Sequence, residues 1–351
     1  MTVQRRHVAA AGLAAAAALG VPRHAGAQSP ASVVRVLSTT DRVAAQGLID
    51  DFELRHAGHR VDYVELNSAE LYERLSAALR DGRPEADIAW SSAMDLQIKL
   101  VNDGAAERHV TRHADALPRW AVWKHEAYGT GVEPVGLLVR RDWAEREGLP
   151  RTHAALAERL AADPKGLAGR VATYDIARAG LGYLLAAQDL MAHPQHWELL
   201  RALGRTGARL HTETRAMLEQ VARGDAVLAY NVLGSYAQAF ARQRTDVDVA
   251  YFSDYTLVAS RVAFVVRGAP HAAAARRWLD HLLSPEGQRA LARSGGQFPI
   301  RADVAAGAPE QPPVLGAAAR PISLGPGLLA HLDASKREAL LRRWRAAFSP
   351  S

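Results

Sequence analysis

The feature that most constrains this fold is a recurring unit of a short apolar strand, a hydroxyl-rich turn and an amphipathic helix. The first unit has a β-branched run at 33–37, a Ser-Thr-Thr-Asp turn and a helical pattern through Phe52. Two more strands, at 60–66 and 87–90, are each followed by a helical pattern. The units recur at intervals of about thirty residues, an alternation that predicts a parallel α/β sheet.

A second series of apolar strands follows in the middle of the chain. We expect these strands at 135–140, 170–173, 226–230 and 254–266. Helical periodicity marks 183–191, 217–223, 270–283, 285–294 and 333–348. The intervening stretch 300–321 is rich in Ala, Gly and Pro, and is expected to form an irregular loop.

Polar side chains follow strands of both series. They are Ser38, Thr39, Thr40, Ser91, Ser92, Thr173, Asp175, Tyr230 and Asn231. Ligands of open α/β sheets bind outside the carboxyl ends of the strands, where free N–H groups of helix starts favour anions. Each Ser or Thr can equally be only a helix N-cap. Because four such loops occur, we expect a shared pocket for an anion.

Two further groups are candidates for ligand contacts. Thr130 and Glu133 precede the strand that enters the second series, which predicts a hinge with side chains facing a cleft. The alternative for Glu133 is a buried carboxylate satisfied by backbone N–H groups. Arg178 and Arg261 are suited to bidentate binding of an anionic ligand, or to an ion pair with an Asp of the same domain.

Motifs of catalysis and cofactor binding are missing. The chain has no G-x-S-x-G, H-E-x-x-H or Walker A sequence. Gly325–Ala330 has the spacing of a dinucleotide loop, but it contains a proline and no strand unit follows, so a turn is predicted. His193 and His196 could be two metal ligands, but the proline between them favours a surface turn over a metal site. We therefore predict no enzyme activity, no cofactor and no metal.

Composition narrows the class of protein further. There is no cysteine, which excludes disulfides, thiolate metal sites and cysteine nucleophiles. The formal charge of +6 falls to +3 if residues 1–27 are removed, because these contain Arg5, Arg6 and Arg23. No dense basic stripe with interleaved aromatics is present, so nucleic acid is not an expected partner.

The first 27 residues have the order of an export signal. Arg5 and Arg6 precede an apolar run at 8–21, and Ala25-Gly26-Ala27 offers small residues for cleavage. Fourteen residues make a helix of about 21 Å, which is too short for the roughly 30 Å hydrocarbon core. The adjacent arginines leave both the general secretion route and the twin-arginine route open. The mature 324 residues exceed the usual size of one domain, so two are expected.

Several phrases resemble one group of bacterial extracellular solute-binding proteins. They are Asp87–Gln97 (DIAWSSAMDLQ), Tyr128-Gly129-Thr130, Glu133-Pro134-Val135, Tyr230–Tyr236 (YNVLGSY), Asp254–Leu257, Leu282–Gln288 (LLSPEGQ) and Pro299-Ile300-Arg301. This group is related to ferric-iron-binding proteins and is more similar to phosphoglycerate transport regulatory and sugar-phosphate-binding proteins.

The resemblance implies the two-lobed type II periplasmic-binding-protein fold, in which two open α/β domains are joined by hinge strands and close on the ligand. We expect lobe 1 at 28–128 plus 255–300, lobe 2 at 129–254, and a C-terminal loop and helix packing on the lobes at 301–351. Ferric carriers use two adjacent tyrosines as iron ligands. Here Tyr230 and Tyr236 are separated by five residues, which disfavours iron, and Tyr236 is a further candidate contact for the anionic ligand.

The expected function is capture of a small organic anion, phosphorylated or carboxylated, by a monomeric periplasmic protein. Its expected partner is an inner-membrane ABC permease. One alternative is a sensory role, with the periplasmic domain of a histidine kinase as partner, and another is ferric-iron binding.

If residues 1–27 are an export signal, the exported protein lacks them. Protein recovered from the bacterial envelope should begin near Gln28, because the charged segment, apolar run and small-residue site are in the order that signal peptidase recognises. N-terminal sequencing measures this directly, and an intact Met1 in the envelope fraction would contradict it.

Overall fold

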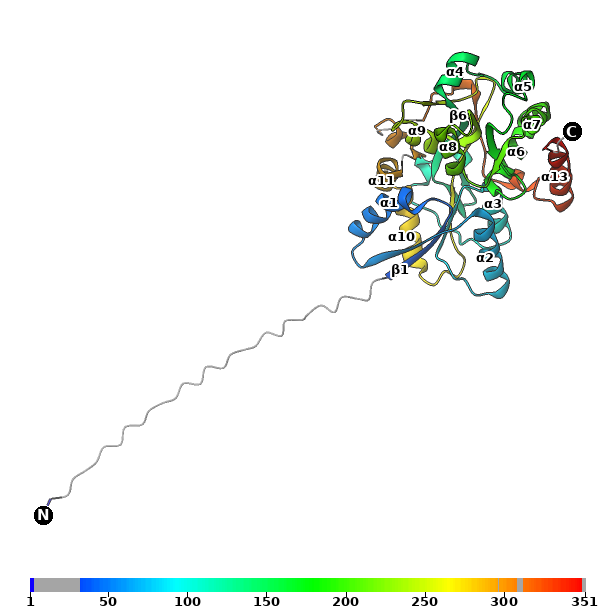
Figure 1. The fold of residues 1–351 in the computed structure, drawn as a ribbon. Helices are drawn as coiled ribbons and strands as arrows, with labels where there is room; N and C mark the ends of the chain where they lie inside the picture. The colour runs from blue at the N-terminus through cyan, green and yellow to red at the C-terminus, as the bar shows by residue number, and fades with distance from the viewer. Residues whose placement is uncertain (3–31, 296, 308–311, 349–351) are drawn as a thin grey trace.

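The computed structural model describes residues 1–2, 32–295, 297–307 and 312–348, which form two β-sheets with helices packed around them (Figure 1). The predicted signal segment at 1–27 lies outside the described residues, except for its first two. Within the described residues, no helix is long and apolar enough to cross a membrane.

The first sheet has the strand order β2-β1-β3-β12-β5-β4. Its strands are β1 (Ser32–Ser38), β2 (His59–Glu65), β3 (Ile88–Ser91), β4 (Val122–Trp123), β5 (Ala127–Gly129) and β12 (Val262–Val265). The pairs β1–β2 and β1–β3 are parallel, as the repeated unit predicts. β12 runs antiparallel to β3 and β5, so the sheet is mixed rather than purely parallel.

Five helices pack with this sheet. They are α1 (Arg42–Arg55), α2 (Ser68–Asp81), α3 (Met94–Asn102), α10 (Ala272–Leu283) and α11 (Pro285–Gly295). In α1 the apolar positions Leu48, Ile49 and Phe52 recur at helical spacing and are all buried. The T-shaped contact of Phe52 with Trp278 of α10, at 5.0 Å between ring centroids, joins the two helices in the core.

The second sheet has the order β14-β11-β6-β9-β7-β8, with β10 and β13 also pairing with β6. Its strands are β6 (Gly131–Arg140), β7 (Val171–Tyr174), β8 (Arg209–His211), β9 (Leu228–Leu233), β10 (Val247–Ala250), β11 (Thr256–Ala259), β13 (Phe298–Pro299) and β14 (Ala319–Pro321). β7 is parallel to β8 and β9, whereas β6 is antiparallel to β9 and β11.

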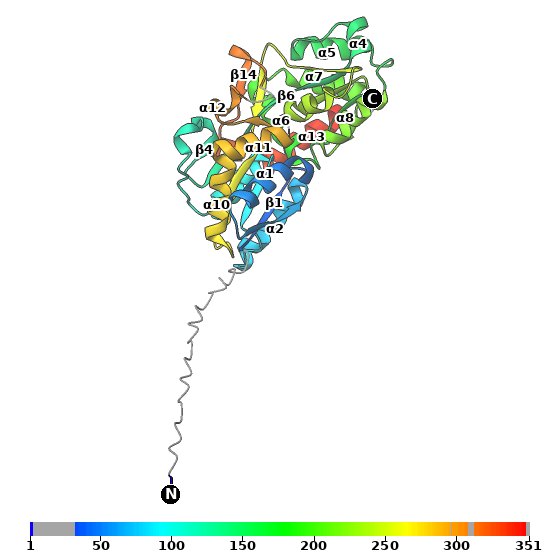
Figure 2. The same ribbon diagram turned by 90° about the vertical axis from the view of Figure 1, so that its left-hand side faces the viewer.

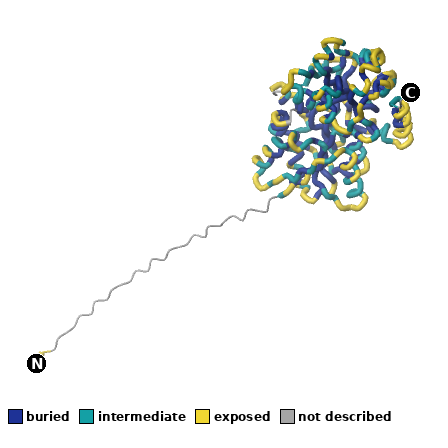
Figure 3. The backbone as a smooth tube through the Cα atoms, viewed as in Figure 1, coloured by how far each residue is buried: buried dark blue, intermediate teal, exposed yellow. Residues whose placement is uncertain are grey.

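The helices around the second sheet follow its strands along the chain. They are α4 (Arg141–Glu147), α5 (His153–Ala162), α6 (Gly180–Ala192), α7 (His196–Arg205), α8 (Thr214–Arg223) and α9 (Gly234–Ala241). The C-terminal helix α13 (Ala334–Phe348) lies beside α7 (Figure 1). Figure 3 shows that the buried residues lie in the interior and the exposed ones at the periphery.

The chain crosses between the sheets at two adjacent points. Thr130 connects β5 to β6, and Ser260-Arg261 connects β11 to β12. The two crossings are hydrogen-bonded, since Thr130 N donates to Arg261 O at 2.9 Å and to Ser260 Oγ at 3.1 Å. The single strand expected at 254–266 is therefore two strands, one in each sheet.

A buried glutamine fixes a third connection. Gln288 of α11 donates from Nε2 to Thr130 O at 3.0 Å and accepts from Ile300 N at 2.8 Å. Its side chain thus ties the first crossing to the segment that follows β13. In its described residues, the expected irregular loop at 300–321 contains three short ordered elements: α12 (Ala302–Ala305), a 3-10 helix at Gly316–Ala318, and β14. α12 and β14 lie in the orange part of the chain (Figure 2).

The packing of α13 on α7 depends on a glycine. A Cβ at Gly204 would lie 1.8 Å from the carbonyl oxygen of Ala347, a backbone atom that no side-chain rotation can move. We expect Gly204→Ala to lower the free energy of unfolding by about 1–3 kcal/mol, although alanine is the better helix former. Urea unfolding measures this.

Gly327→Ala is the matched control, because a Cβ there meets no atom within 4 Å. Equal stability of the Gly204→Ala protein and the wild type would show that α13 does not pack tightly on α7.

Candidate functional site

A cavity of about 790 Å³ lies between the two sheets and is lined by residues of both. From the first sheet's side come Thr39, Asp41, Glu65, Asn67 and Ser92. From the second side come Tyr174, Arg178, Thr212, Arg215 and Tyr236, and Arg261 contributes from the crossing. This volume is within the usual range of pockets for small molecules.

Helix N-termini converge on this cavity. Residues of the N-cap or first turn of five helices line it, and Ser92 lies two residues before a sixth, α3. The five helices are α1 with Asp41, α2 with Asn67, α6 with Ala179, α8 with Glu213 and α9 with Leu233. The first turns of helices carry unpaired N–H groups and partial positive charge, so their convergence favours a negatively charged ligand.

The two hydroxyl-rich turns of the first sheet meet at the cavity. Because β1 and β3 are adjacent and in register at Ser38 and Trp90, the residues that follow them are neighbours. Thr39 Oγ1 accepts from Ser92 N at 3.0 Å and lies 3.4 Å from both Ser91 Oγ and Ser92 Oγ. Thr39 and Ser92 line the cavity, whereas the buried Ser91 accepts from Ala93 N.

On the side of the second sheet, a tyrosine and a threonine connect two turns in the same way. Tyr174, at the end of β7, has its hydroxyl 2.5 Å from Oγ1 of Thr214, the first residue of α8. Burial raises the pKa of Tyr174, so this phenol stays protonated and can donate a hydrogen bond.

Four arginines line the cavity, and they differ in their partners. Arg215 is paired with Asp41, an exposed ion pair that joins α8 to the start of α1 across the cavity. Arg337 of α13 stacks over Tyr183 at 5.2 Å. In the described part of the chain, neither Arg178 nor Arg337 forms an ion pair, so both guanidinium groups remain available to an anion.

The fourth, Arg261, is buried where the chain crosses between the sheets. It forms an ion pair with the buried Glu133, which also accepts from Ser235 Oγ at 2.5 Å. Its guanidinium lies 5.1 Å from the ring of Tyr236. Burial alone would lower the pKa of Arg261, but the charge of Glu133 and the contact with Tyr236 raise it. Glu133 therefore holds Arg261 rather than facing the cavity.

Carboxylates also line the cavity. Asp41 is paired with Arg215, Glu65 accepts from Arg42 N at 2.7 Å, and the other acidic side chains, Glu70, Glu73 and Glu213, are exposed. Carboxylates accept hydrogen bonds from hydroxyl groups. The cavity thus combines anion-attracting helix ends with acceptors for a hydroxylated ligand.

Several predicted site residues have structural partners instead. Thr130 Oγ1 accepts from Trp90 Nε1 at 2.8 Å, Ser38 Oγ accepts from Thr40 N at 3.0 Å, and Asp175 Oδ1 accepts from Ala177 N at 3.0 Å. Ser38, Thr40, Thr130 and Thr173 are buried. None of them lines the cavity, although Ser38, Thr40, Thr173 and Asp175 each adjoin a lining residue in sequence.

Tyr230 and Asn231 were expected to contact the ligand, but they lie in a separate buried network. Tyr230 hydroxyl and Asn231 Nδ2 donate to Asp189 Oδ2 at 3.2 and 2.8 Å, and Tyr255 hydroxyl donates to Asp189 Oδ1 at 3.1 Å. A β-bulge redirects them: β9 shifts register opposite Gly136 and Leu137, and Asn231 has φ of 63°.

Sequence reasoning missed several lining residues. Asn67 and Ser68 follow β2, and Thr212 and Thr214 follow β8, so the strand-end rule applies to both turns. β8 was not recognised because two of its three residues are exposed and the segment lacks an apolar pattern.

The fold and this cavity define a two-lobed ligand-binding protein. The family model described as bacterial extracellular solute-binding protein matches residues 34–296, and the chain belongs to this family. The family implies a small-molecule ligand, a membrane permease as partner and a periplasmic location. A search of curated protein sequences gives no match.

Three solved structures illustrate the similarity. The substrate-binding protein of an ABC transporter from Agrobacterium tumefaciens is 34% identical, with a TM-score of 0.84 over 91% of this chain and 95% of that one. AfuA from Actinobacillus pleuropneumoniae, solved with fructose-6-phosphate, is 14% identical, with a TM-score of 0.73 over 91% and 99%. Iron-bound HitA from Pseudomonas aeruginosa is 16% identical, with a TM-score of 0.70 over 90% and 99%.

The network around Asp189 predicts sensitivity to acid. His196 is buried beside Asp189, with 3.7 Å between Nε2 and Oδ2, and burial lowers its pKa from 6.5 to about 4. Because the unfolded chain binds this proton below pH 6.5 and the folded chain only below about pH 4, stability falls as the pH falls through this window. Between pH 7 and pH 5 the loss should be about 2 kcal/mol.

Urea unfolding of the wild type and His196→Leu at both pH values tests this, since leucine removes the titrating group. The variant should lose less stability on acidification, whereas His193→Gln, at an exposed position of the same turn, should behave like the wild type. Identical pH dependence of the wild type and His196→Leu would contradict the prediction.

Proposed function

We propose that this protein captures a small organic anion, phosphorylated or carboxylated, in the cavity between its lobes and delivers it to an inner-membrane ABC permease. The observation that carries the proposal is the convergence of helix N-termini on a cavity that also holds two arginines without an ion pair. Both features stabilise negative charge. The rim carboxylates add acceptors, which favours an anion that also bears hydroxyl groups.

The structures with known ligands support this proposal to different degrees. AfuA was solved with a sugar phosphate, which combines the two chemical features that the cavity favours. HitA was solved with iron. In this chain Tyr230 is bound to Asp189 and Tyr236 lies by Arg261, so the two phenols do not share one site. Among the described residues, no group of three His, Cys, Asp or Glu is arranged to hold a metal.

A thermal-shift screen tests whether the ligand is an anion. Phosphorylated sugars, phosphoglycerates and di- and tricarboxylates are compared with neutral sugars, amino acids and ferric citrate. A true ligand at a hundredfold excess over Kd stabilises the folded protein by about 2.7 kcal/mol, which should raise Tm by several degrees. We expect only anions to do so, and ferric citrate to give no tyrosinate-to-iron absorption band. A shift with neutral compounds alone would overturn the assignment.

The Arg178→Gln variant tests whether the ligand binds in the cavity between the lobes. Loss of a charged hydrogen bond costs about 1.5–3 kcal/mol, so the Kd of the ligand should rise at least tenfold, as measured by calorimetry. Arg205→Gln is the matched control, because Arg205 is an exposed arginine of the same lobe that does not line the cavity. Unchanged affinity in Arg178→Gln combined with Ser92→Ala would exclude this cavity as the site.

A further inference from the structure

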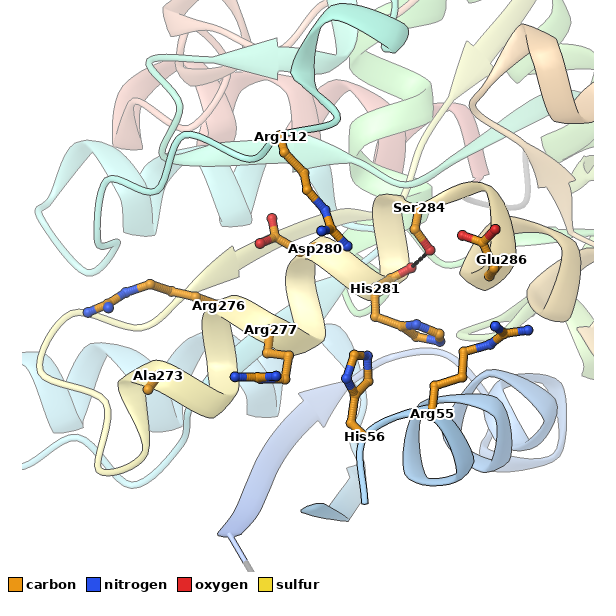
Figure 4. A pocket seen from close by; sticks show the side chains of 10 residues that line it. All are labelled: Arg55, His56, Arg112, Ala273, Arg276, Arg277, Asp280, His281, Ser284 and Glu286. Carbon is orange, nitrogen blue, oxygen red and sulfur yellow. Dashed lines mark hydrogen bonds between the residues drawn. The ribbon is translucent and has the colours of Figure 1, made fainter. Parts of the chain in front are cut away.

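A second cavity, of about 480 Å³, opens on the lobe of the first sheet. The end of α1, Arg112 and helix α10 line it, and none of its residues lines the cavity between the lobes (Figure 4). Four arginines line this second cavity against two carboxylates, Asp280 and Glu286. Its lining therefore carries an excess of positive charge.

The arginines fall into two pairs. Arg55 is bound to Asp51 at 2.7 Å, and Arg276 to Glu107 at 2.7 Å, with the Arg276 guanidinium directed away from the other side chains (Figure 4). Arg112 and Arg277 form no ion pair within the described residues. Arg112 donates from Nε to His113 Nε2 at 3.2 Å, which leaves its terminal amino groups and the guanidinium of Arg277 to bind an anion.

Two histidines, His56 and His281, line the same cavity (Figure 4). The rings of His56 and His281 are perpendicular, with centroids 5.5 Å apart. Burial, followed by the charges of Arg277, His59, Arg112 and Arg55, lowers the pKa of His56. The charges of Arg277, Arg112 and Arg55 thus all act on His56, and a bound anion would offset them.

The inner wall supplies a buried polar group without a hydrogen bond. His281 is 95% buried, and within the described structure its Nε2 has no hydrogen-bond partner; Asp51 Oδ2 lies 3.4 Å away. Buried polar atoms without a partner are uncommon in folded proteins, and one that borders a cavity is a natural contact for a ligand. Asp280, in contrast, is engaged by His109 Nε2 at 2.9 Å.

We infer that this cavity is a second binding site, for a phosphate group, in which Arg112 and Arg277 donate to the phosphate oxygens beside His56 and His281. Guanidinium groups bind phosphate through paired, charge-assisted hydrogen bonds. The site is separate from the cavity between the lobes, so it holds whether or not that cavity takes an anion. The phosphate can come from a soluble phosphomonoester or from a phospholipid headgroup.

A titration of the mature protein with inorganic phosphate tests the site. The probe is the imidazole proton signal of His56 in NMR spectra, identified by its loss in His56→Gln. We expect a saturable shift whose Kd rises at least tenfold in the double variant Arg112→Gln/Arg277→Gln. The control Arg276→Gln should stay within about twofold of the wild type, because that guanidinium is held by Glu107. Arg178→Gln, in the other cavity, should change nothing.

Co-sedimentation with vesicles distinguishes the two sources. Binding to vesicles of phosphatidylcholine with phosphatidic acid, lost in the double variant, assigns the site to a lipid headgroup. A phosphate-induced shift without vesicle binding assigns it to a soluble phosphomonoester. The inference fails if neither probe gives a saturable response, or if Arg276→Gln weakens binding as much as the double variant, since the attraction would then be a diffuse surface charge.

Discussion

The buried ion pair of Arg261 and Glu133 is the interaction on which the rest of the structure depends. A charged group without a partner in the interior costs several kcal/mol, so each residue requires the other. The pair lies where the chain passes between the sheets: Arg261 is part of one crossing, and Glu133 is in β6 just after the other. It therefore fixes the crossings relative to each other. It also turns the Arg261 side chain toward Tyr236 at the inner end of the cavity.

That arrangement explains why helix starts meet between the lobes. In each lobe, parallel strands point their carboxyl ends toward the crossing region, so the turns after β1, β2, β3, β7 and β8 all open there. The attraction of the cavity for an anion comes from backbone N–H groups at helix starts of both lobes and from arginines of the second side and of the crossing, and it acts against the carboxylates that also line the cavity. No single loop supplies this attraction, so no short sequence motif indicates the site.

The sequence allowed the strand–turn–helix units to be predicted because their apolar runs are buried. β3 and β9, for example, are buried along their whole length. Of the ligand contacts predicted from the sequence, Thr39, Ser92, Arg178, Tyr236 and Arg261 line the cavity. The directions of Tyr230 and Asn231 could not be predicted, because a bulge is set by pairing with a strand about ninety residues away. The Asp41–Arg215 contact could not be predicted either, because its two residues are 174 positions apart in the sequence.

The Asp41–Arg215 ion pair bears on how the proposed capture works. It is the ion pair that bridges the cavity from α1 to α8, and the side chains are 27% and 56% exposed. Exposed ion pairs contribute at most about 1 kcal/mol, so this one cannot by itself hold the two lobes together. An anion bound by helix ends of both lobes makes contacts that exist only when the lobes are close. A ligand shifts such an equilibrium by its difference in affinity for the two states. In the proposed function, the free energy that keeps the lobes together therefore comes from the ligand, and the ion pair sets only their alignment.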